Sequence, residues 1–489
     1  MPHHRISSRT PISPAAKRTD HQNVREMGST NNALRVFLIL TVACAVCAKE
    51  RAGAKKGNAA AASPTPGDAA APDGAAKASG AEGAFDITTL GATNDGKTDS
   101  TEVNKGQVMA WSRDEVNLIG ALDITCCSIL MMVMMDLVDQ ALQDAWTSAC
   151  RATGSATVLI PKGEYLVGPL NFTGPCKAAI TIQLDGTLLG SNDLAKYTAS
   201  WIEVSHVENI VITGPGTLDG QGTGVYTKSK TDCKALPNTL VLYYVTNATV
   251  SGIRLLNSKF FHINIDTSKD VTVKDVSITA PADVENTDGV HVGGSSKVSI
   301  TNASIGTGDD CVSIGPGSSG VMVTNIVCGP GQGISVGCLG RYKDEKDVMD
   351  VTVRDCVLKH TTNGVRIKSY EDAESVLTAS NLTFENIQME EVANPIIIDQ
   401  YYCPQKVCPG KRANSSHVSV KDVTFRNITG TSSTPEAVSL LCSETQPCSG
   451  VHLLDVNVKY AGKNNKTIAV CTNAKGTSRG SSEALACLV

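Results

Sequence analysis

The sequence NTDGVH at residues 286–291 is followed by GDDCVS at residues 308–313 and by GQGIS at residues 331–335. In these three stretches the apolar residues Val290, Val312 and Ile334 follow one another at intervals of 22 residues. A repeat of this length is typical of one coil of a β-solenoid, in which residues at the same place in the repeat stack in adjacent coils. The sequence therefore predicts a solenoid in which the acids of these stretches lie close together.

A second pattern supports the same fold. It consists of an apolar residue, any residue, then Asn, Asp or Gly, followed by an apolar residue, any residue and another apolar residue. Eight copies carry at the third place Gly252, Asp275, Asn302, Asn325, Asp355, Asn386, Asn427 and Asp455. The apolar places are expected to point inward, and Asn or Asp tolerates the left-handed bend that joins one strand to the next. Two interleaved ladders of strands that each advance once per coil predict an all-β chain, a right-handed parallel β-helix.

The composition agrees with this fold class. Aromatic residues make up only 4% of the chain, and there are 43 glycines, which suits short strands and tight turns rather than a helical bundle. The one helix predicted with its ends covers residues 141–150, and we expect it to cap the N-terminal end of the solenoid. A formal net charge of −5 gives no reason to expect nucleic acid as a partner.

The N-terminal part is typical of a secreted protein. Residues 27–48 contain a basic residue, an apolar run and small residues at the end, which predicts a signal peptide, and the run is too short to span a membrane. Residues 1–26 are then an upstream extension that is foreign to the mature protein. Residues 49–84 are rich in Ala, Pro and Gly and predict a flexible linker. The catalytic domain is expected at residues 85–489.

Residues 103–140 interrupt this domain with a methionine-rich apolar run that has no strand periodicity. Two interpretations stay open. The segment is either an insertion outside the fold, such as retained intron sequence, or a lid or membrane-contact helix. The first interpretation is favoured because joining Glu102 directly to Ala141 produces an uninterrupted capped helix.

The chain has 17 cysteines, of which 13 remain after the signal peptide and the anomalous insertion are set aside. Secretion favours disulfides, and an odd number predicts at least one free thiol. The short-range candidate pairs are Cys150–Cys176, Cys311–Cys328, Cys403–Cys408, Cys442–Cys448 and Cys471–Cys487. Seven glycosylation sequons, some of them expected to serve only as turn asparagines, begin at Asn171, Asn247, Asn302, Asn381, Asn414, Asn427 and Asn465.

Charged residues gather on the ladder that starts at Val290. Strand alternation places Arg366 and Lys368 on the outer face, one and three residues after the buried apolar position of their coil. Strict alternation would point Asp288 and Asp310 inward. We expect the turn before each strand to break the pleat, because unpaired acids are costly to bury. Acids and cations then share one face of the solenoid.

Such a face is suited to hydrolysis of an acidic polysaccharide. Crowded carboxylates raise one another's pKa, so that one stays protonated while others are ionised. A protonated acid beside an ionised one can protonate a glycosidic oxygen and activate water. The two cations would bind an anionic group of the substrate.

Two other interpretations of the acids were weighed. Carboxylates clustered on a β-helix can bind Ca²⁺, but the two nearby cations argue against a metal site. A purely structural acidic ladder is the other possibility. Neither explains why cations share the face.

The motifs NTD at residues 286–288, GDD at residues 308–310 and RIK at residues 366–368 resemble, in this order, those of polygalacturonases, the pectin hydrolases of glycoside hydrolase family 28. The resemblance covers residues 85–102 and 141–489, and the C-terminal half is similar to plant pollen exopolygalacturonases. It implies an inverting, exo-acting hydrolase of polygalacturonic acid from the non-reducing end, secreted to the cell wall. It implies no metal and no cofactor. A closed solenoid needs no partner subunit, which favours a monomer.

The resemblance also implies roles for single residues. Asp309 would be the general acid, and Asp288 and Asp310 would position and deprotonate the water. Arg366 and Lys368 would bind the galacturonate carboxylate. Tyr402 matches a substrate-contacting tyrosine of the family, whereas Tyr401 is expected to be a bystander.

One position departs from the family pattern. The family has Gly-His-Gly where this chain has Gly331-Gln332-Gly333. Gln332 can form hydrogen bonds with substrate but cannot carry a charge, which predicts slower turnover and a changed pH profile. His291, on the neighbouring coil, is either a substitute for the missing histidine or, as we favour, a packing and sugar-contact residue.

Three functions therefore compete. The first is an active pectin hydrolase, and the second is a weak or inactive homologue that binds pectin. The third is a pectate lyase, which would need Ca²⁺ ligands and an arginine base, and the ordered motifs do not match it.

Overall fold

The structure is a computed structural model that describes residues 83–92, 124–226, 236–373, 375–404, 416–463 and 466–488, with side chains only from residue 138 onward in the second range. The predicted upstream extension and signal peptide lie outside the described residues. So do nearly all of the predicted linker and the first part of the anomalous insertion, residues 103–123.

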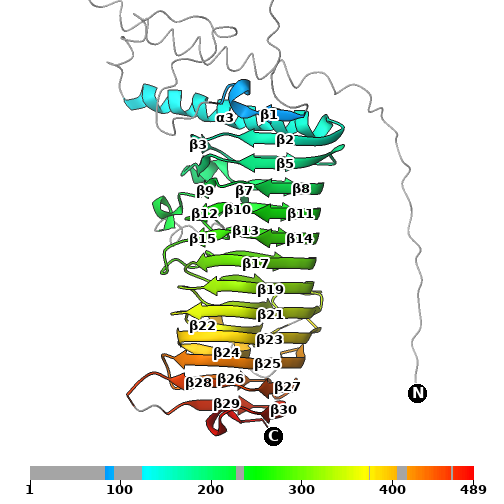
Figure 1. Ribbon diagram of the computed structural model, residues 1–489, viewed down its shortest axis with the longest axis vertical. Coiled ribbons are helices and arrows are strands. Elements are labelled where there is room, and N and C mark those ends of the chain that lie inside the picture. Colours follow the sequence, from blue (N-terminus) through cyan, green and yellow to red (C-terminus); the bar gives the residue numbers. More distant parts are fainter. Residues whose placement is uncertain are drawn as a thin grey trace, which may run out of the picture. The chain divides into compact units, whose positions relative to one another are not determined.

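The described strands form two long parallel sheets that wind around one core, as the stacked arrows in Figure 1 show. The first sheet has 19 strands. They are β1 (Ala84–Asp86), β2 (Gly154–Ile160), β3 (Glu164–Val167), β5 (Ala178–Leu184), β6 (Thr187–Gly190), β8 (Glu208–Thr213), β9 (Thr217–Asp219), β11 (Thr246–Ser251), β12 (Arg254–Leu256), β14 (Lys269–Lys274), β15 (Ser277–Thr279), β17 (Ser296–Gly306), β19 (Ser319–Cys328), β21 (Val348–Lys359), β23 (Leu377–Val392), β25 (Val418–Ser432), β27 (Cys448–Leu454), β28 (Asn457–Tyr460) and β30 (Ala474–Arg479). Its long members carry the second sequence pattern.

The second sheet has 11 strands and carries the residues of the predicted site. They are β4 (Leu170–Thr173), β7 (Ser200–Ser205), β10 (Asn238–Tyr243), β13 (Ile263–Asp266), β16 (Val290–Gly293), β18 (Val312–Ile314), β20 (Ile334–Leu339), β22 (Asn363–Tyr370), β24 (Asn394–Tyr402), β26 (Glu436–Leu441) and β29 (Ile468–Thr472). Each strand pairs with the strand of the next coil, which is the order of a parallel β-helix. The predicted fold is confirmed.

The register follows the apolar ladder read from the sequence. Val290 pairs with Val312, Val312 with Ile334 and Ile334 with Val365, and the ladder continues to Ile396. All five side chains are buried. Burial fixes this register, because a shift by one residue would turn the whole apolar set toward solvent.

The residues that were expected to adopt a left-handed backbone conformation do so at the turns between strands. All eight third-place residues of the second pattern have φ between 48° and 75°. Neighbouring copies bond to each other, as in Asn302 to Asp275 and Asn427 to Asn386. The sequon asparagines Asn302 and Asn427 therefore act in turn ladders, as expected, and Asn247 and Asn381 form the same kind of contact with Asn209 and Asp350.

Helix α3 (Ile124–Arg151) caps the N-terminal end of the solenoid (Figure 1). It contains the predicted helix at residues 141–150 but begins 17 residues before it. Val138 is buried, and Asp139 accepts a hydrogen bond of 2.9 Å from Gly168 N. Residues 124–140, part of the segment expected to lie outside the fold, therefore belong to the same helix as the cap. The C-terminal part of this helix packs on the solenoid, with Trp146 stacked on Phe172. Short 3₁₀ helices are η1 (Ile87–Leu90), η2 (Leu194–Lys196), η3 (Gly222–Gly224) and η5 (Glu483–Leu485).

Four predicted disulfides are present, namely Cys150–Cys176, Cys311–Cys328, Cys442–Cys448 and Cys471–Cys487. Cys403 is also disulfide-bonded, and its predicted partner Cys408 lies outside the described residues. Cys338 and Cys356 are free, in agreement with the expected unpaired thiol.

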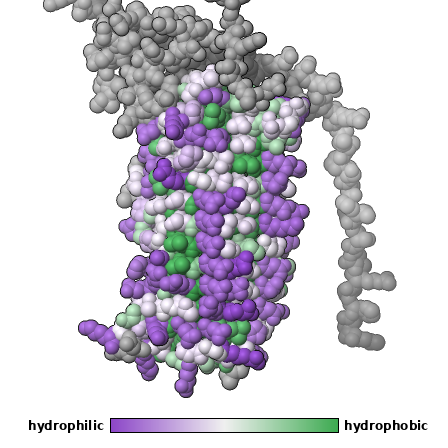
Figure 2. All heavy atoms as spheres, viewed as in Figure 1, coloured by the Kyte–Doolittle hydropathy of each residue, from purple (hydrophilic) through white to green (hydrophobic). Residues whose placement is uncertain are grey.

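The surface seen in Figure 2 is mostly hydrophilic, with only small apolar patches between polar stripes. This follows from strand alternation, which sends the Val, Ile and Leu ladders into the single core. No helix in the described part of the chain is both long and apolar enough to cross a membrane.

Candidate active site

The three acids lie on the turns that lead into two adjacent strands. Asp288 precedes β16, and Asp309 and Asp310 precede β18. The turns bond to each other through Gly289 N to Asp310 O at 2.9 Å and Gly308 N to Thr287 Oγ1 at 3.0 Å. Gly308 has no side chain because a Cβ there would overlap the carbonyl of Val284. The residues of these motifs therefore stabilise the two turns and also supply the carboxylates.

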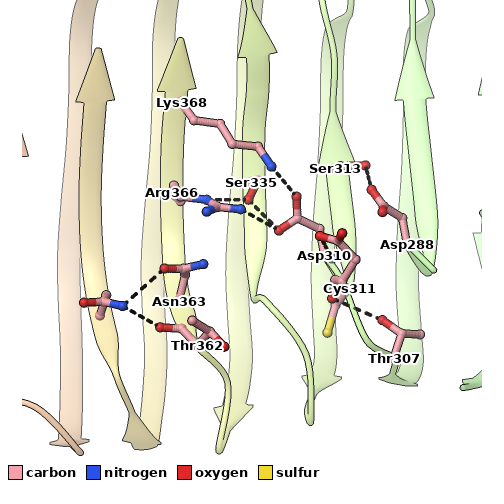
Figure 3. A network of polar contacts seen from close by, with 12 residues as sticks. Asp288, Thr307, Asp310, Cys311, Ser313, Ser335, Thr362, Asn363, Arg366 and Lys368 are labelled. Carbon is pink, nitrogen blue, oxygen red and sulfur yellow. Dashed lines mark hydrogen bonds and ion pairs between the residues drawn. The ribbon is translucent and has the colours of Figure 1, made fainter. Parts of the chain in front are cut away.

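Asp310 is the centre of a buried ionic network (Figure 3). Lys368 Nζ lies 2.8 Å from Asp310 Oδ2, and Arg366 Nη2 lies 3.1 Å from Oδ1. Ser335 donates to Oδ1 at 2.8 Å and accepts from Arg366 Nε at 3.2 Å. The carboxylate is 1% exposed, so all three partners serve to compensate its burial.

This arrangement refines one expectation. The carboxylates of Asp288 and Asp310 bond to Ser313 and Ser335, which alternate with core residues along their strands, and both carboxylates are buried rather than solvated. Burial is tolerated at Asp310 because both cations pair with it. Arg366 and Lys368 are therefore held by the protein itself, and a substrate carboxylate must share them with Asp310.

Asp309 is the most accessible of the three acids. Its Oδ1 accepts from Asp310 N and its Oδ2 accepts from Asn286 N, both at 2.9 Å. No cation forms a salt bridge with it in the described part of the chain. These contacts fix the carboxyl group while leaving it without a compensating positive partner.

Asp288 is linked to His291 through a serine. Ser313 donates to Asp288 Oδ2 at 2.5 Å, and the hydroxyl lies 2.8 Å from His291 Nδ1. Since the hydroxyl proton goes to the acid, Nδ1–H must donate to Ser313. Phe261 stacks on the imidazole with ring centroids 4.8 Å apart. His291 thus packs against an aromatic ring and is linked to Asp288 through Ser313.

The environment separates the pKa values of the acids. Burial, and then the charge of neighbouring acids, raises the pKa of Asp288 well above its ordinary value and also raises that of Asp309. Burial acts in the same direction on Asp310, but Lys368 and Arg366 outweigh it and lower its pKa. Burial lowers the pKa of His291 to about 4, so the imidazole is neutral. One ionised acid therefore lies beside two that retain protons readily, whereas the sequence predicts a single protonated acid beside ionised ones; burial of Asp288 is the reason for the difference.

Tyr402 lies over the cations. Its ring centroid is 5.9 Å from Arg366 Cζ and 5.5 Å from Lys368 Nζ. The hydroxyl of Tyr401 instead donates to Cys442 O, away from the acids. The structure thus brings Tyr402, and not Tyr401, to the predicted site.

Gln332 lies next to Asp309, because its backbone N–H donates to Asp309 O at 2.9 Å. Its side chain is half-buried and makes no hydrogen bond with the other described residues. The amide is therefore adjacent to the acid without being engaged by it.

The donor set does not favour a metal. Lys368 and Arg366 occupy the positions beside Asp310 that a Ca²⁺ ion would need. Within the described ranges, no group of three His, Cys, Asp or Glu side chains is arranged to hold a metal ion.

Sequence reasoning missed the roles of Ser313 and Ser335. Serine is so common on strand surfaces that its type carries no signal. Their repeat positions could have identified them, since each lies one residue after the buried apolar position in the coil that follows an acid.

Comparisons with known proteins identify the family of this chain. Residues 150–486 match the family described as glycosyl hydrolases family 28. The chain belongs to this family, and the predicted glycoside hydrolase class is confirmed. An exopolygalacturonase from Zea mays is 52% identical over 467 residues, which cover 94% of this chain and all of the relative. An exopolygalacturonase from Oenothera organensis is 42% identical and covers 70% of this chain and 95% of the relative.

Solved structures share the fold. The endo-xylogalacturonan hydrolase of Aspergillus tubingensis matches with a TM-score of 0.63 and 24% identity, over 71% of this chain and 96% of that one. Endopolygalacturonase I of Stereum purpureum, solved with two galacturonates, matches with a TM-score of 0.53 and 20% identity, over 70% of this chain and 98% of that one. At such identities the match shows the architecture alone.

Proposed function

We propose that this protein is a secreted exopolygalacturonase that hydrolyses the α-1,4-galacturonosyl bonds of polygalacturonic acid with inversion. The observation that carries the proposal is the set of three acids with opposed pKa shifts beside two cations and an aromatic ring. The exo mode is supported by the similarity to relatives named exopolygalacturonases.

The acid of the reaction is Asp309. Its raised pKa keeps a proton available, and it is the acid with most access to solvent and substrate. As the bond between the anomeric carbon and the leaving oxygen breaks, the Asp309 proton moves to that oxygen.

The base is Asp288. One of its oxygens accepts from Ser313, and the other is left for the attacking water. Water attacks the anomeric carbon from the opposite side and gives a proton to Asp288. This step requires Asp288 to be ionised. The Ser313 hydrogen bond and the Lys368 charge act toward ionisation, but burial and the charges of Asp309 and Asp310 outweigh them and raise its pKa, so the ionised fraction of Asp288 grows as pH rises. Asp310 positions the site, since its oxygens are already bonded to Ser335, Arg366 and Lys368.

Arg366, Lys368 and Tyr402 bind one galacturonate unit. The guanidinium offers five N–H groups, of which the structure uses those to Ser335 and Asp310, so others remain for a substrate carboxylate. The Tyr402 ring would contact the sugar beside that carboxylate, and its position over Lys368 supports this role.

The test is an assay of the full chain, expressed with its N-terminal segment in a secreting host, on polygalacturonic acid. We expect release of monomer as the only early product, formed as the β-anomer in proton NMR. A ladder of oligomers would contradict exo action, and an unsaturated product absorbing in the ultraviolet would indicate a lyase. An N-terminus of the secreted product just after Ala48 would support the predicted signal peptide.

A pectin-binding homologue with little activity is the second candidate, and the observation that favours it is the unengaged Gln332 side chain. It would be indicated by binding of polygalacturonate without sugar release, in the parent chain and in the Gln332→His variant alike.

A further inference from the structure

Arg341 is a cation near the site that has no role in the proposed mechanism. It lies on the turn after β20, and its side chain is exposed. Among the residues that the structure describes, no carboxylate pairs with it. Glu345, on the same turn, instead accepts from the backbone N–H groups of Gly340 at 2.6 Å and Tyr342 at 2.8 Å. The charge of Arg341 is therefore available to a ligand.

Two tyrosines hold the guanidinium in place. Arg341 Cζ lies 5.6 Å from the ring centroid of Tyr342 and 5.3 Å from that of Tyr370. Its Nη1 also donates to the Tyr370 hydroxyl at 2.9 Å. Stacking and one hydrogen bond restrict the side chain in advance, which lowers the entropy cost of binding a partner.

The same tyrosine connects Arg341 to the cations of the site. The ring of Tyr370 packs edge-on against that of Tyr402, with centroids 5.6 Å apart, and Tyr402 faces Arg366 and Lys368. The acids precede their strands, whereas Arg341 follows its strand. The order across this face is therefore the acids, the Arg366–Lys368 pair, the two tyrosines and Arg341.

We propose that Arg341 binds the carboxylate of a third uronic acid unit of the chain: the first two units lie on either side of the cleaved bond, and the second of them is bound by Arg366 and Lys368. The proposal rests on the proposed function and extends it by one subsite. The planar guanidinium fork matches a carboxylate, and each unit of the unesterified polymer carries one. A two-unit substrate would be too short to use this subsite, and a methyl-esterified unit would lack the charge.

The experiment compares the full chain with its Arg341→Gln variant on digalacturonate and on polygalacturonate at low salt. We expect KM for the polymer to rise about two- to fivefold, the range of an exposed ion pair, with kcat unchanged. KM for digalacturonate should stay constant, and Arg341→Lys should recover part of the loss. The matched control is Arg426→Gln, an equal loss of charge at an exposed arginine on β25 in the first sheet, which should leave both substrates unaffected.

Two results would overturn the proposal. One is an unchanged KM for the polymer in Arg341→Gln. The other is an equal rise for both substrates, which would mean that Arg341 acts only by supporting Tyr370 and Tyr402. Binding of polygalacturonate to Asp309→Asn and to the Asp309→Asn/Arg341→Gln pair is measured as well. If the parent chain proves inactive, the proposed function fails, while weaker binding by the double variant would still support the subsite.

Discussion

Lys368 and Asp310 form a buried ion pair across three strands of the second sheet, with Nζ 2.8 Å from Oδ2 and both side chains less than 10% exposed. Arg366 shares the same carboxylate. The residues expected to hold the substrate are therefore held first by an acid of the protein, and this relationship determines the charge, the geometry and the stability of the site.

The stability of the site depends on Asp310. Asp310→Asn leaves Arg366 and Lys368 buried without a counter-charge, so we expect the free energy of unfolding to fall by about 3–5 kcal/mol. Thermal and chemical denaturation at neutral pH measure this change. Arg426→Gln, which removes an exposed ion pair, is the control and should change stability by less than about 1 kcal/mol. Equal effects of the two variants would contradict the buried network.

Asp288→Asn should act in the opposite direction on stability. Because the pKa of Asp288 is higher in the folded than in the unfolded chain, ionisation destabilises the fold, and this penalty grows as pH rises above the unfolded value. The variant removes the penalty, so it should be more stable than the parent at neutral pH and nearly equal to it in acid, while losing activity. Denaturation at both pH values tests the sign, and a loss of stability at neutral pH would refute it.

The pH profile of activity should be bell-shaped, because Asp288 must lose its proton and Asp309 must keep it, and both pKa values are raised. The raised pKa of Asp309 keeps the acid protonated above the ordinary carboxyl range, and kcat/KM should fall as pH rises through that pKa. The lowered pKa of Asp310 keeps its ion pairs intact at moderately acidic pH. Initial rates on polygalacturonate between pH 3 and pH 8 give the profile, and an alkaline optimum would exclude Asp309 as the acid.

Ser313→Ala separates His291 from Asp288. Loss of a hydrogen bond to a charged group should lower kcat about tenfold with little change in KM. The same substitution at Ser439, which lies on the same outward ladder of β26 away from the acids, is the matched control and should leave kcat unchanged. If kcat is equally insensitive at both serines, Ser313 does not orient the base.

Gln332→His should raise kcat and shift the pH profile, because a titratable ring would stand beside Asp309 where the amide now makes no hydrogen bond with described residues. Parallel assays of Gln332→His and Gln332→Asn on polygalacturonate measure the effect. Only the histidine is expected to increase turnover. A decrease would show that this chain has adapted to the amide.

Much of the site was predictable from local patterns. The spacing of Val290, Val312 and Ile334 set the register, and the register placed the acids and both cations on one face. Local patterns failed where a contact joins distant coils. Nothing near Arg366 in the sequence indicates that it pairs with Asp310, 56 residues earlier.

The sequence alone determined the β-helical fold, because a repeated alternation of apolar and polar residues buries its apolar face when the strands wind around a single core. It also determined which chemical groups the site contains. Only the tertiary structure decided which acid keeps its proton, since pKa shifts depend on burial and on charges brought together from different coils. The same stacking of coils pairs Arg366 and Lys368 with Asp310, whereas Asp309 forms no salt bridge with a described residue. It also brings Arg341 against Tyr370, where no described carboxylate pairs with its charge.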